Sequence, residues 1–497
     1  MMLASKAFFI FLPLVLLGYH CLARREHKFR FLTVASWVFY AWAGPQYLLV
    51  LGSLTVIDYI AGLRIEAANE DRHRRRWVAI SVVANLGILA AFKYTAFVYD
   101  TGLALLQFGG YDIPDRAWRI LLPLGISFHT FQGISYTVDV YRRKIAAVRS
   151  FWDYALFVTF FPQLAAGPII RATEFLPQMQ TPPRVSAAQI SDGLWLFVTG
   201  LFKKLFIADQ LDLLIVSPVF AQPELADAAL IRWAMLAWAV QIYCDFSGYT
   251  DIALGTGKLF GFELPPNFRL PYLATSITDF WRRWHLSLST WLRDYLYFPL
   301  GGSQGSALRT YGNLMLVFVL CGLWHGAEWR WFVYGVYNGI LMSLHRGYDR
   351  SLAGISWCDR LRTSPAWVGI AWLATMVQLL LGLVLIRMES WSTGLFMIEQ
   401  AFSFEPALPP AEGVLTGVPV AVPLLMLLGM LGHLRAAEEL LANHFPFPLP
   451  IPAPGSIFRP APGPVPEMLR GFVAATAVVL LVTLGPGVTQ SFIYIQF

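Results

Sequence analysis

The sequence predicts an all-α, polytopic integral membrane protein. Of its 497 residues, 57% are hydrophobic and only 14% are charged, whereas an ordinary soluble domain carries about 25% charged residues. The chain also holds 37 Phe, 18 Trp and 20 Tyr, more aromatic side chains than soluble cores could bury with so few charges. Apolar runs near membrane-spanning length alternate with short Arg-rich loops. These features argue against a soluble enzyme and exclude a disordered chain.

The N-terminal apolar run, residues 7–23, is predicted to be a retained membrane span and not a cleaved signal peptide. Its basic residues follow it, at 24–30, so its N-terminus is expected outside the cytoplasm. Residues 31–63 are again apolar but are interrupted by Ala43-Gly44-Pro45, which predicts a hairpin of two helices. The hairpin returns the chain to the side it left, where the Arg-rich residues 64–76 follow.

The runs 77–98 and 119–140 are predicted to leave this side and return to a basic cluster at 142–149. Three basic clusters therefore fall on one side, which the positive-inside rule assigns to the cytoplasm. Several later runs are short or broken by Gly and Pro, which predicts re-entrant segments and about ten or more helices in all. These later runs are 151–170, 190–208, 230–256, 311–324, 329–346, 366–388, 414–434 and 471–490.

We divide the chain into three parts on these patterns. Residues 1–150 are expected to form N-terminal transmembrane helices, and residues 151–350 a catalytic core that holds the chemically distinctive motifs. Residues 351–497 are expected to form C-terminal helices, with an extended connector at the proline-rich stretch 446–466.

Residues 276–302 have the pattern of an amphipathic helix at the membrane interface. On a helical wheel, Trp281 and Trp284 fall on an aromatic arc, whereas Arg282 and Arg283 fall on the opposite arc. His285 lies at the edge of the aromatic arc. From the wheel alone, a residue that only bridges the polar and apolar faces is favoured over a functional histidine.

His325 ends an apolar helix, with Trp324 beside it and Gly322 and Gly326 around it. An ionisable residue at the end of a membrane helix is a candidate functional group. A neutral imidazole can take a proton from a hydroxyl and return it later, which suits acyl transfer. The two glycines would let a substrate approach closely. A histidine that only caps the helix C-terminus is an alternative of similar weight.

Residues 241–257 place Asp245 and Asp251 among several hydroxyl side chains in an apolar neighbourhood. Buried carboxylates need partners, so a structural polar network is favoured here over direct catalysis. No metal site is expected, because His325 lacks the second histidine of an H-E-x-x-H motif and the four cysteines are far apart. The Arg residues cluster between apolar spans, so no nucleic-acid surface is expected.

Taken together, the motifs resemble the membrane-bound O-acyltransferases. The resemblance is to the bacterial branch that holds alginate O-acetyltransferases and teichoic acid D-alanyltransferases. It covers about 160–345 most specifically, and the N-terminal third matches in layout. The motifs are FFPQLAAGPIIR at 160–171, CDFSGYTDIALG at 244–255, DFWRRWHLSLSTWLRDYLYFPLGG at 279–302, GLWHG at 322–326 and FIYIQF at 492–497.

The resemblance implies a ring of helices around a thinned core, with a funnel on each side. It implies that His325 is the catalytic residue and His285 its supporting partner. Charge alone suggests that the basic pair beside His285 suits a phosphorylated thioester carrier. The residues expected along the substrate and donor path are Trp281, Arg282, Arg283, Trp284, Trp324 and Asp245.

The expected function is O-acetyl transfer from a cytoplasmic thioester, such as acetyl-CoA, to hydroxyls of an exported polysaccharide such as alginate. The protein would lie in the lipid of the bacterial inner membrane, bind no resident cofactor and act directly or with an extracytoplasmic SGNH-type partner. D-alanyl transfer to teichoic acid is the alternative, which the ratio of 30 Arg to 7 Lys disfavours because it indicates a GC-rich genome. A transporter or flippase is a rival of another class, suggested by Asp58, Lys93, His129 and Asp139.

Overall fold

The computed structural model describes residues 3, 5–111, 123, 125–164, 167–180, 185–403 and 418–442. This part of the chain contains helices and no extended strands, which confirms the all-α prediction. The chain divides into two compact units. Unit 1 consists of Met1–Phe197 and Ile252–Pro265, and unit 2 consists of Val198–Asp251 and Pro266–Phe497. The predicted connector 446–466 and the apolar run 471–490 lie outside the described residues.

The helices of unit 1 correspond to the apolar runs of the first part of the sequence. The break at residues 43–45 does separate two helices, because Pro45 has no amide hydrogen to continue a helical ladder. The helices are α1 (Lys6–Cys21), α2 (Arg25–Ala41), α3 (Tyr47–Ala67), α4 (Asp71–Lys93), α5 (Thr95–Phe108), α6 (Ile126–Tyr141), α7 (Phe151–Thr159), α8 (Phe161–Leu164), α9 (Ala172–Gln180) and most of α10 (Ala187–Leu201).

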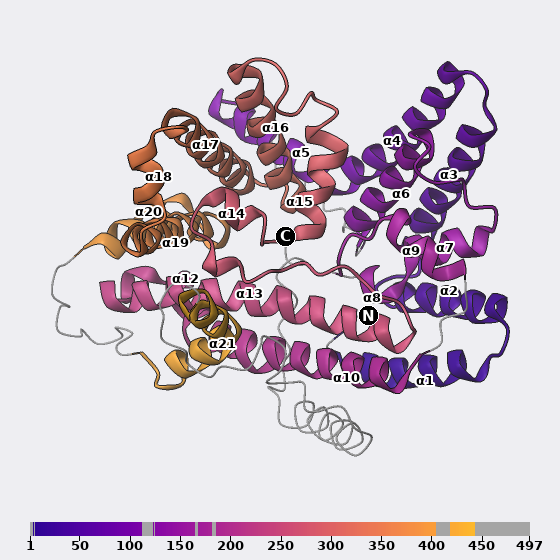
Figure 1. The fold of residues 1–497 in the computed structure, drawn as a ribbon, viewed down its shortest axis with the longest axis horizontal. Helices are drawn as coiled ribbons and strands as arrows, with labels where there is room; N and C mark the ends of the chain where they lie inside the picture. The colour runs from indigo at the N-terminus through magenta and orange to yellow at the C-terminus, as the bar shows by residue number, and fades with distance from the viewer. Residues whose placement is uncertain are drawn as a thin grey trace. The chain divides into compact units, whose positions relative to one another are not determined.

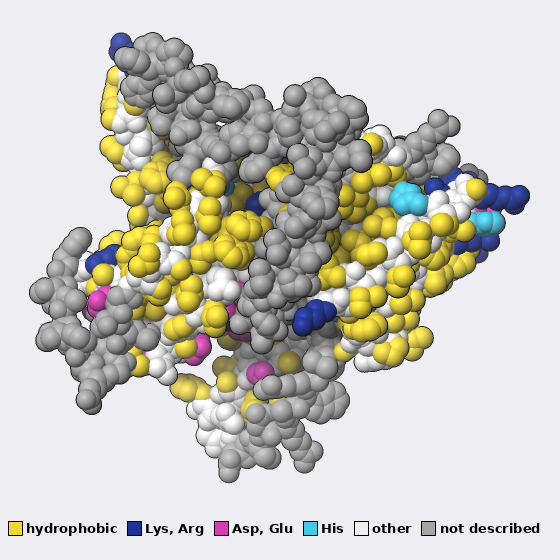
Figure 2. Space-filling view, turned by 90° about the horizontal axis from the view of Figure 1, so that it is seen from below, with side chains coloured by type: hydrophobic (Ala, Val, Ile, Leu, Met, Phe, Trp, Pro, Cys, Tyr) yellow, Lys and Arg dark blue, Asp and Glu magenta, His cyan; other side chains and the backbone are white. Residues whose placement is uncertain are grey.

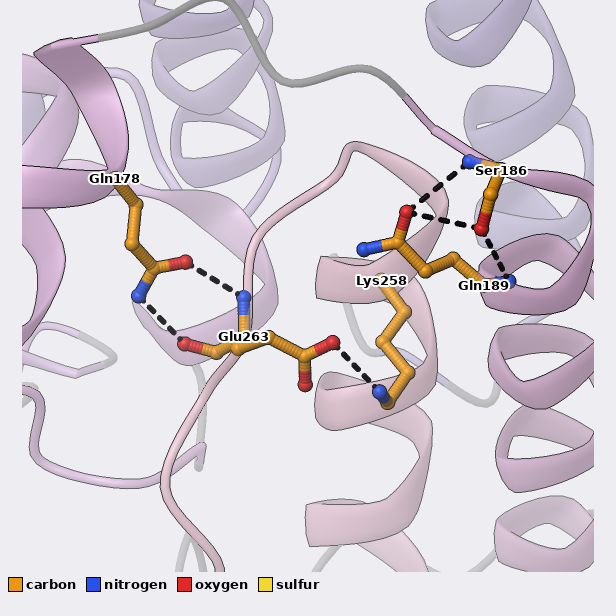
Figure 3. A network of polar contacts seen from close by, with 5 residues as sticks. All are labelled: Gln178, Ser186, Gln189, Lys258 and Glu263. Atoms are coloured by element: carbon orange, nitrogen blue, oxygen red, sulfur yellow. Dashed lines mark hydrogen bonds and ion pairs between the residues drawn. The ribbon is translucent and has the colours of Figure 1, made fainter.

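Within unit 1, α3, α4 and α6 pack side by side, as Figure 1 shows. Polar contacts connect α9 to the C-terminal end of the long helix α13. The side-chain amide of Gln178 pairs with the backbone of Glu263, accepting from its N–H at 2.8 Å and donating to its carbonyl at 2.9 Å (Figure 3). Lys258 in turn pairs with the Glu263 carboxylate at 2.7 Å. Ser186 and Gln189 cap the start of α10 in the same view.

Unit 2 holds the distinctive motifs. Its first part contains two π-helical turns, which are often found at functional sites. Its elements are η1 (Phe202–Ala208), α11 (Asp209–Leu211), η2 (Asp212–Val216), α12 (Ser217–Ala221), η3 (Pro223–Leu225), α13 (Ala228–Leu259, whose end enters unit 1), η4 (Pro271–Leu273), α14 (Ile277–Trp281), α15 (Leu286–Leu292), η5 (Arg293–Tyr297), α16 (Ala307–His325), α17 (Trp329–Leu352), α18 (Ser356–Arg362), α19 (Pro365–Arg387), α20 (Trp391–Phe402) and α21 (Ala421–Ala442).

The prediction of one amphipathic helix over residues 276–302 is wrong. The segment consists of the short helix α14, a turn, the short helix α15 and the π-helical turn η5. His285 lies at the break with a φ of 47° and a ψ of 54°, a left-handed conformation that a non-glycine residue rarely adopts. A helical wheel assumes a continuous helix. Because the helix breaks at His285, residues before and after this position do not form one common face.

Four of the described helices, α3, α4, α16 and α19, are long and apolar enough to cross a membrane. Two shorter apolar helices, α1 and the stretch Ala421–Leu431 of α21, add to them. Figure 2 shows that hydrophobic side chains cover much of the described surface on the face drawn. Large apolar side chains such as Leu49 and Val83 are 78% and 70% exposed, which fits contact with lipid and not with water. The chain is a multi-pass membrane protein.

Candidate active site

The turn that carries His285 is held in place by Asn267. The Asn267 carbonyl accepts a hydrogen bond from the Leu286 N–H at 2.9 Å, and its side-chain oxygen accepts one from Ser287 Oγ at 2.6 Å. The side-chain nitrogen Nδ2 of Asn267 donates to Thr250 Oγ1 on α13 at 3.3 Å. Asn267 therefore ties the first turn of α15 to α13. These bonds compensate for the strained backbone of His285, which is completely buried.

His325 is the last residue of α16, and Trp331 at the start of α17 packs on it. The two rings are stacked, with centroids 5.3 Å apart and planes inclined by 23°. The flanking glycines make this packing possible: a Cβ on Gly326 would collide with the indole of Trp331, and a Cβ on Gly322 would collide with the Trp331 carbonyl. The expectation that these glycines admit the substrate is therefore corrected. They admit Trp331 and the close approach of α17.

The two histidines lie together, as the resemblance implied. Their ring centroids are 6.3 Å apart, and Trp324 contacts both, at 4.8 Å from His325 and 6.3 Å from His285. Phe246 of α13 packs edge-on against His285 at 4.7 Å. His285 is fully buried and His325 is 8% exposed.

A narrow cavity connects His325 with the aromatic residues of α14. Trp281, Trp284, His325 and Trp331 all line it. The Trp281 N–H donates to the side-chain oxygen of Asn338 at 3.2 Å, which fixes the indole across the cavity. The cavity offers only about 20 Å³ to water-sized molecules, on the order of what a single water requires. His325 thus faces a tight, largely apolar slot.

A second, wider cavity of about 680 Å³ lies next to the slot. The two cavities share Ile277 and Gln378 in their linings. Arg282 lines this wider cavity, whereas Arg283 forms an ion pair with Asp279 at 2.9 Å. The two arginines that the sequence places side by side therefore differ in environment. Arg282 is the one available to a ligand in the wider cavity.

Asp245 belongs to a buried ion cluster that joins α13 to η1 and α11. Its carboxylate pairs with Lys204, which also pairs with Asp209 at 2.9 Å. All three side chains are at most 3% exposed. Lys204 is thus an ion-pair partner of Asp245. These contacts form a structural polar network, which is the role that the sequence favoured for Asp245.

Three residues of the site were not singled out in the sequence: Trp331, Asn338 and Asn267. Trp331 could have been found from its place five residues after Gly326, in the aromatic run WRWF. Nothing in the local pattern signalled Asn267, because its role depends on contacts with α13 and α15. Among the residues that the structure describes, no three His, Cys, Asp or Glu side chains gather as a metal site requires.

The profile of the membrane-bound O-acyltransferase family matches residues 140–385, which include both histidines. A probable alginate O-acetylase AlgI of Pseudomonas aeruginosa is 40% identical over 408 residues, or 81% of this chain and 75% of the relative.

Two further relatives act on other acceptors, to judge from their names. A peptidoglycan O-acetyltransferase of Helicobacter pylori is 35% identical over 426 residues, or 79% of this chain and 77% of the relative. A teichoic acid D-alanyltransferase of Bacillus subtilis is 27% identical over 238 residues, or 46% of this chain and 60% of the relative. The similarity to the two acetylating relatives is thus more extensive than the similarity to the D-alanyl transferase.

Proposed function

This chain belongs to the membrane-bound O-acyltransferase family, and from that premise we propose that His325 is its catalytic residue. The protein is a membrane O-acetyltransferase by its relatives, and the finer proposal concerns how the reaction is carried out. The observation that supports it most is the pairing of two buried histidines beside an apolar slot, with centroids 6.3 Å apart. A capping role alone does not explain why His325 lines a cavity together with Trp281 and Trp284.

In the proposed reaction, the His325 imidazole takes the proton of an attacking hydroxyl. The hydroxyl oxygen forms a bond to the thioester carbonyl carbon, the carbon–sulfur bond breaks, and the imidazolium returns its proton to the leaving thiolate. Trp331 holds the imidazole plane by stacking, and Trp324 packs against both histidines. His285 is a positioning residue here, because it is fully buried and is absent from the lining of the slot.

We further propose that the donor is a cytoplasmic acyl thioester such as acetyl-CoA, which enters through the wider cavity. Arg282 lines that cavity, and its cation would attract a phosphorylated carrier. The acceptor would be a hydroxyl of an exported polysaccharide, reached directly or through an extracytoplasmic SGNH-type protein. Under this proposal the protein lies in the bacterial inner membrane with its N-terminus outside the cytoplasm.

The test uses cells that express either the wild-type chain or His325→Ala at equal levels. Mild alkali releases ester-linked acetate from the exported polysaccharide, and the acetate is then quantified. The proposal predicts that the variant yields no acetate above the level of cells that lack the protein. Unchanged acetate from the variant would contradict it.

D-alanyl transfer to teichoic acid is the second candidate, and the 27% identity to such a transferase supports it. The same cell assay separates the two, since alkali would then release D-alanine in place of acetate. The transporter alternative is less well supported, because the family and both acetylating relatives are transferases by name.

A further inference from the structure

A buried carboxylate lies among three helices of unit 1, on segments that the acyl-transfer chemistry does not use. Asp58 of α3 is completely buried, and α4 and α6 pack against α3 (Figure 1). Two side chains of α4 hold the carboxylate. Ser81 donates to Oδ1 at 2.6 Å, and Asn85 Nδ2 donates to Oδ1 and Oδ2 at 2.9 and 3.0 Å.

In the described part of the chain, Asp58 takes part in no ion pair, and two basic side chains of this region have other partners. Arg74 donates to the carbonyls of Ile65 and Tyr141, and Lys144 after α6 pairs with Asp139 at 3.5 Å. Neutral donors offset only part of the cost of burying a charge away from water. The site therefore needs one positive charge from elsewhere.

Asn85 offers a second oxygen at the same place. It is completely buried, and its Nδ2 is committed to the Asp58 carboxylate and to the Ser81 carbonyl. Its Oδ1 meets no hydrogen-bond donor in the described structure. A Cβ on Gly133 of α6 would collide with Asp58 Oδ2 and would come within 3.5 Å of Asn85 Oδ1. The missing side chain of Gly133 thus lets α6 approach both oxygens closely.

We propose that Asp58 and Asn85 bind a single monovalent cation, and that Na⁺ is the ion that fits. One carboxylate balances one positive charge, whereas Ca²⁺ would leave an excess charge and takes six to eight oxygen ligands. The hydroxyls of Ser81 and Thr137, which lie 3.0 Å apart, supply further oxygens beside the carboxylate. A proton on Asp58 would also neutralise the carboxylate. The protonated oxygen would then be a donor, however, and it would face the donor groups of Ser81 and Asn85.

The ion would join α3, α4 and α6, so it should stabilise the folded protein by mass action. The experiment measures the thermal unfolding midpoint of full-length wild type and of Asp58→Asn in an uncharged detergent. Each protein is measured in NaCl and in N-methyl-D-glucamine chloride at equal ionic strength. Na⁺ is expected to raise the wild-type unfolding midpoint by about 2 °C or more and to leave the variant unchanged. Asp153→Asn is the matched control, because this carboxylate of unit 1 is paired with Arg25 at 2.8 Å and should keep the Na⁺ response.

A second measurement needs no variant, in case Asp58→Asn does not fold. Hydrogen exchange of the wild-type protein is recorded in the same two salts. Na⁺ should slow exchange in α3, α4 and α6 and leave α16 and α19 unaffected. Equal wild-type midpoints in the two salts, or equal exchange in the two salts, would overturn the proposal and assign a proton to Asp58. A Na⁺ response in Asp58→Asn would also overturn it, because the ion would then act without Asp58.

Discussion

The indole of Trp331 is stacked on the imidazole of His325, with centroids 5.3 Å apart and planes inclined by 23°. The two residues belong to consecutive helices, and the short turn between α16 and α17 brings them together. Stacking fixes the plane of the imidazole in the slot, which a general base needs if it is to meet the hydroxyl in one geometry. The stability of this pair depends on Gly326, since a Cβ there would occupy the place of the indole.

Gly326→Ala is therefore expected to displace Trp331 and to lower the acetyl-transfer rate by about 10- to 100-fold, because small misplacements of a catalytic group have effects of this size. The measurement is kcat with purified protein and labelled thioester. Gly312→Ala on the same helix is the control, since a Cβ there meets nothing within 4 Å. Equal kcat values for the two variants would show that the stacking is unimportant.

Asn267→Ala is expected to release the turn that carries His285. It removes the acceptor of Ser287 Oγ, at 2.6 Å, and should lower the free energy of unfolding by about 1–3 kcal/mol as well as kcat. Asn313→Ala serves for comparison, because the Asn313 side chain also makes hydrogen bonds, in its case donating to the backbone carbonyls of Leu300 and Gly302. Both variants should lose stability, but only Asn267→Ala should lose kcat in protein that remains folded. A parallel loss in both would mean that Asn267 acts through stability alone.

Lys204→Met should be strongly destabilising, since it leaves Asp209 and Asp245 buried without their shared cation. The expected loss is about 3–5 kcal/mol, as for other buried pairs that lose one partner. The triple variant with Asp209→Asn and Asp245→Asn should regain most of the unfolding midpoint and the activity. An inactive but stable triple variant would show instead that Asp245 takes part in the reaction.

Arg282→Gln is expected to raise the KM for a phosphorylated thioester several-fold and to leave kcat nearly unchanged, because Arg282 lines the wider cavity and not the slot. The difference from wild type should shrink at high salt, which screens an exposed charge. Arg350→Gln provides the control, because this exposed arginine of α17 lines neither cavity. Equal KM values for all three proteins at low salt would exclude a role of Arg282 in donor binding.

Much of the fold could be predicted from the sequence, because helix breakers and apolar run lengths are local signals. Residues 43–45 marked the turn between α2 and α3, and the runs 311–324 and 329–346 correspond to α16 and α17. The break at His285 could not be predicted in this way. The amphipathic pattern of 276–302 continues through it, and the left-handed turn is stabilised by Asn267, which precedes the segment in sequence.

The site was only partly predictable for a similar reason. His325 stood out as an ionisable residue at the end of an apolar helix, but its stacking on Trp331 depends on how α16 and α17 pack. The charges of 282–283 predicted two equivalent arginines, whereas the ion pair with Asp279 engages Arg283 only. Local sequence identifies residue types that can do chemistry, and tertiary contacts decide which of them face the cavity.

The central claim is that His325 moves the proton in acyl transfer. The most direct measurement is single-turnover transfer from a labelled acetyl thioester to a hydroxyl acceptor, with purified protein in lipid vesicles, for wild type, His325→Ala and the exposed control His73→Ala. We predict a loss of at least about 100-fold for His325→Ala, and the wild-type rate for His73→Ala. A folded His325→Ala protein that transfers acetyl at the wild-type rate would contradict the account.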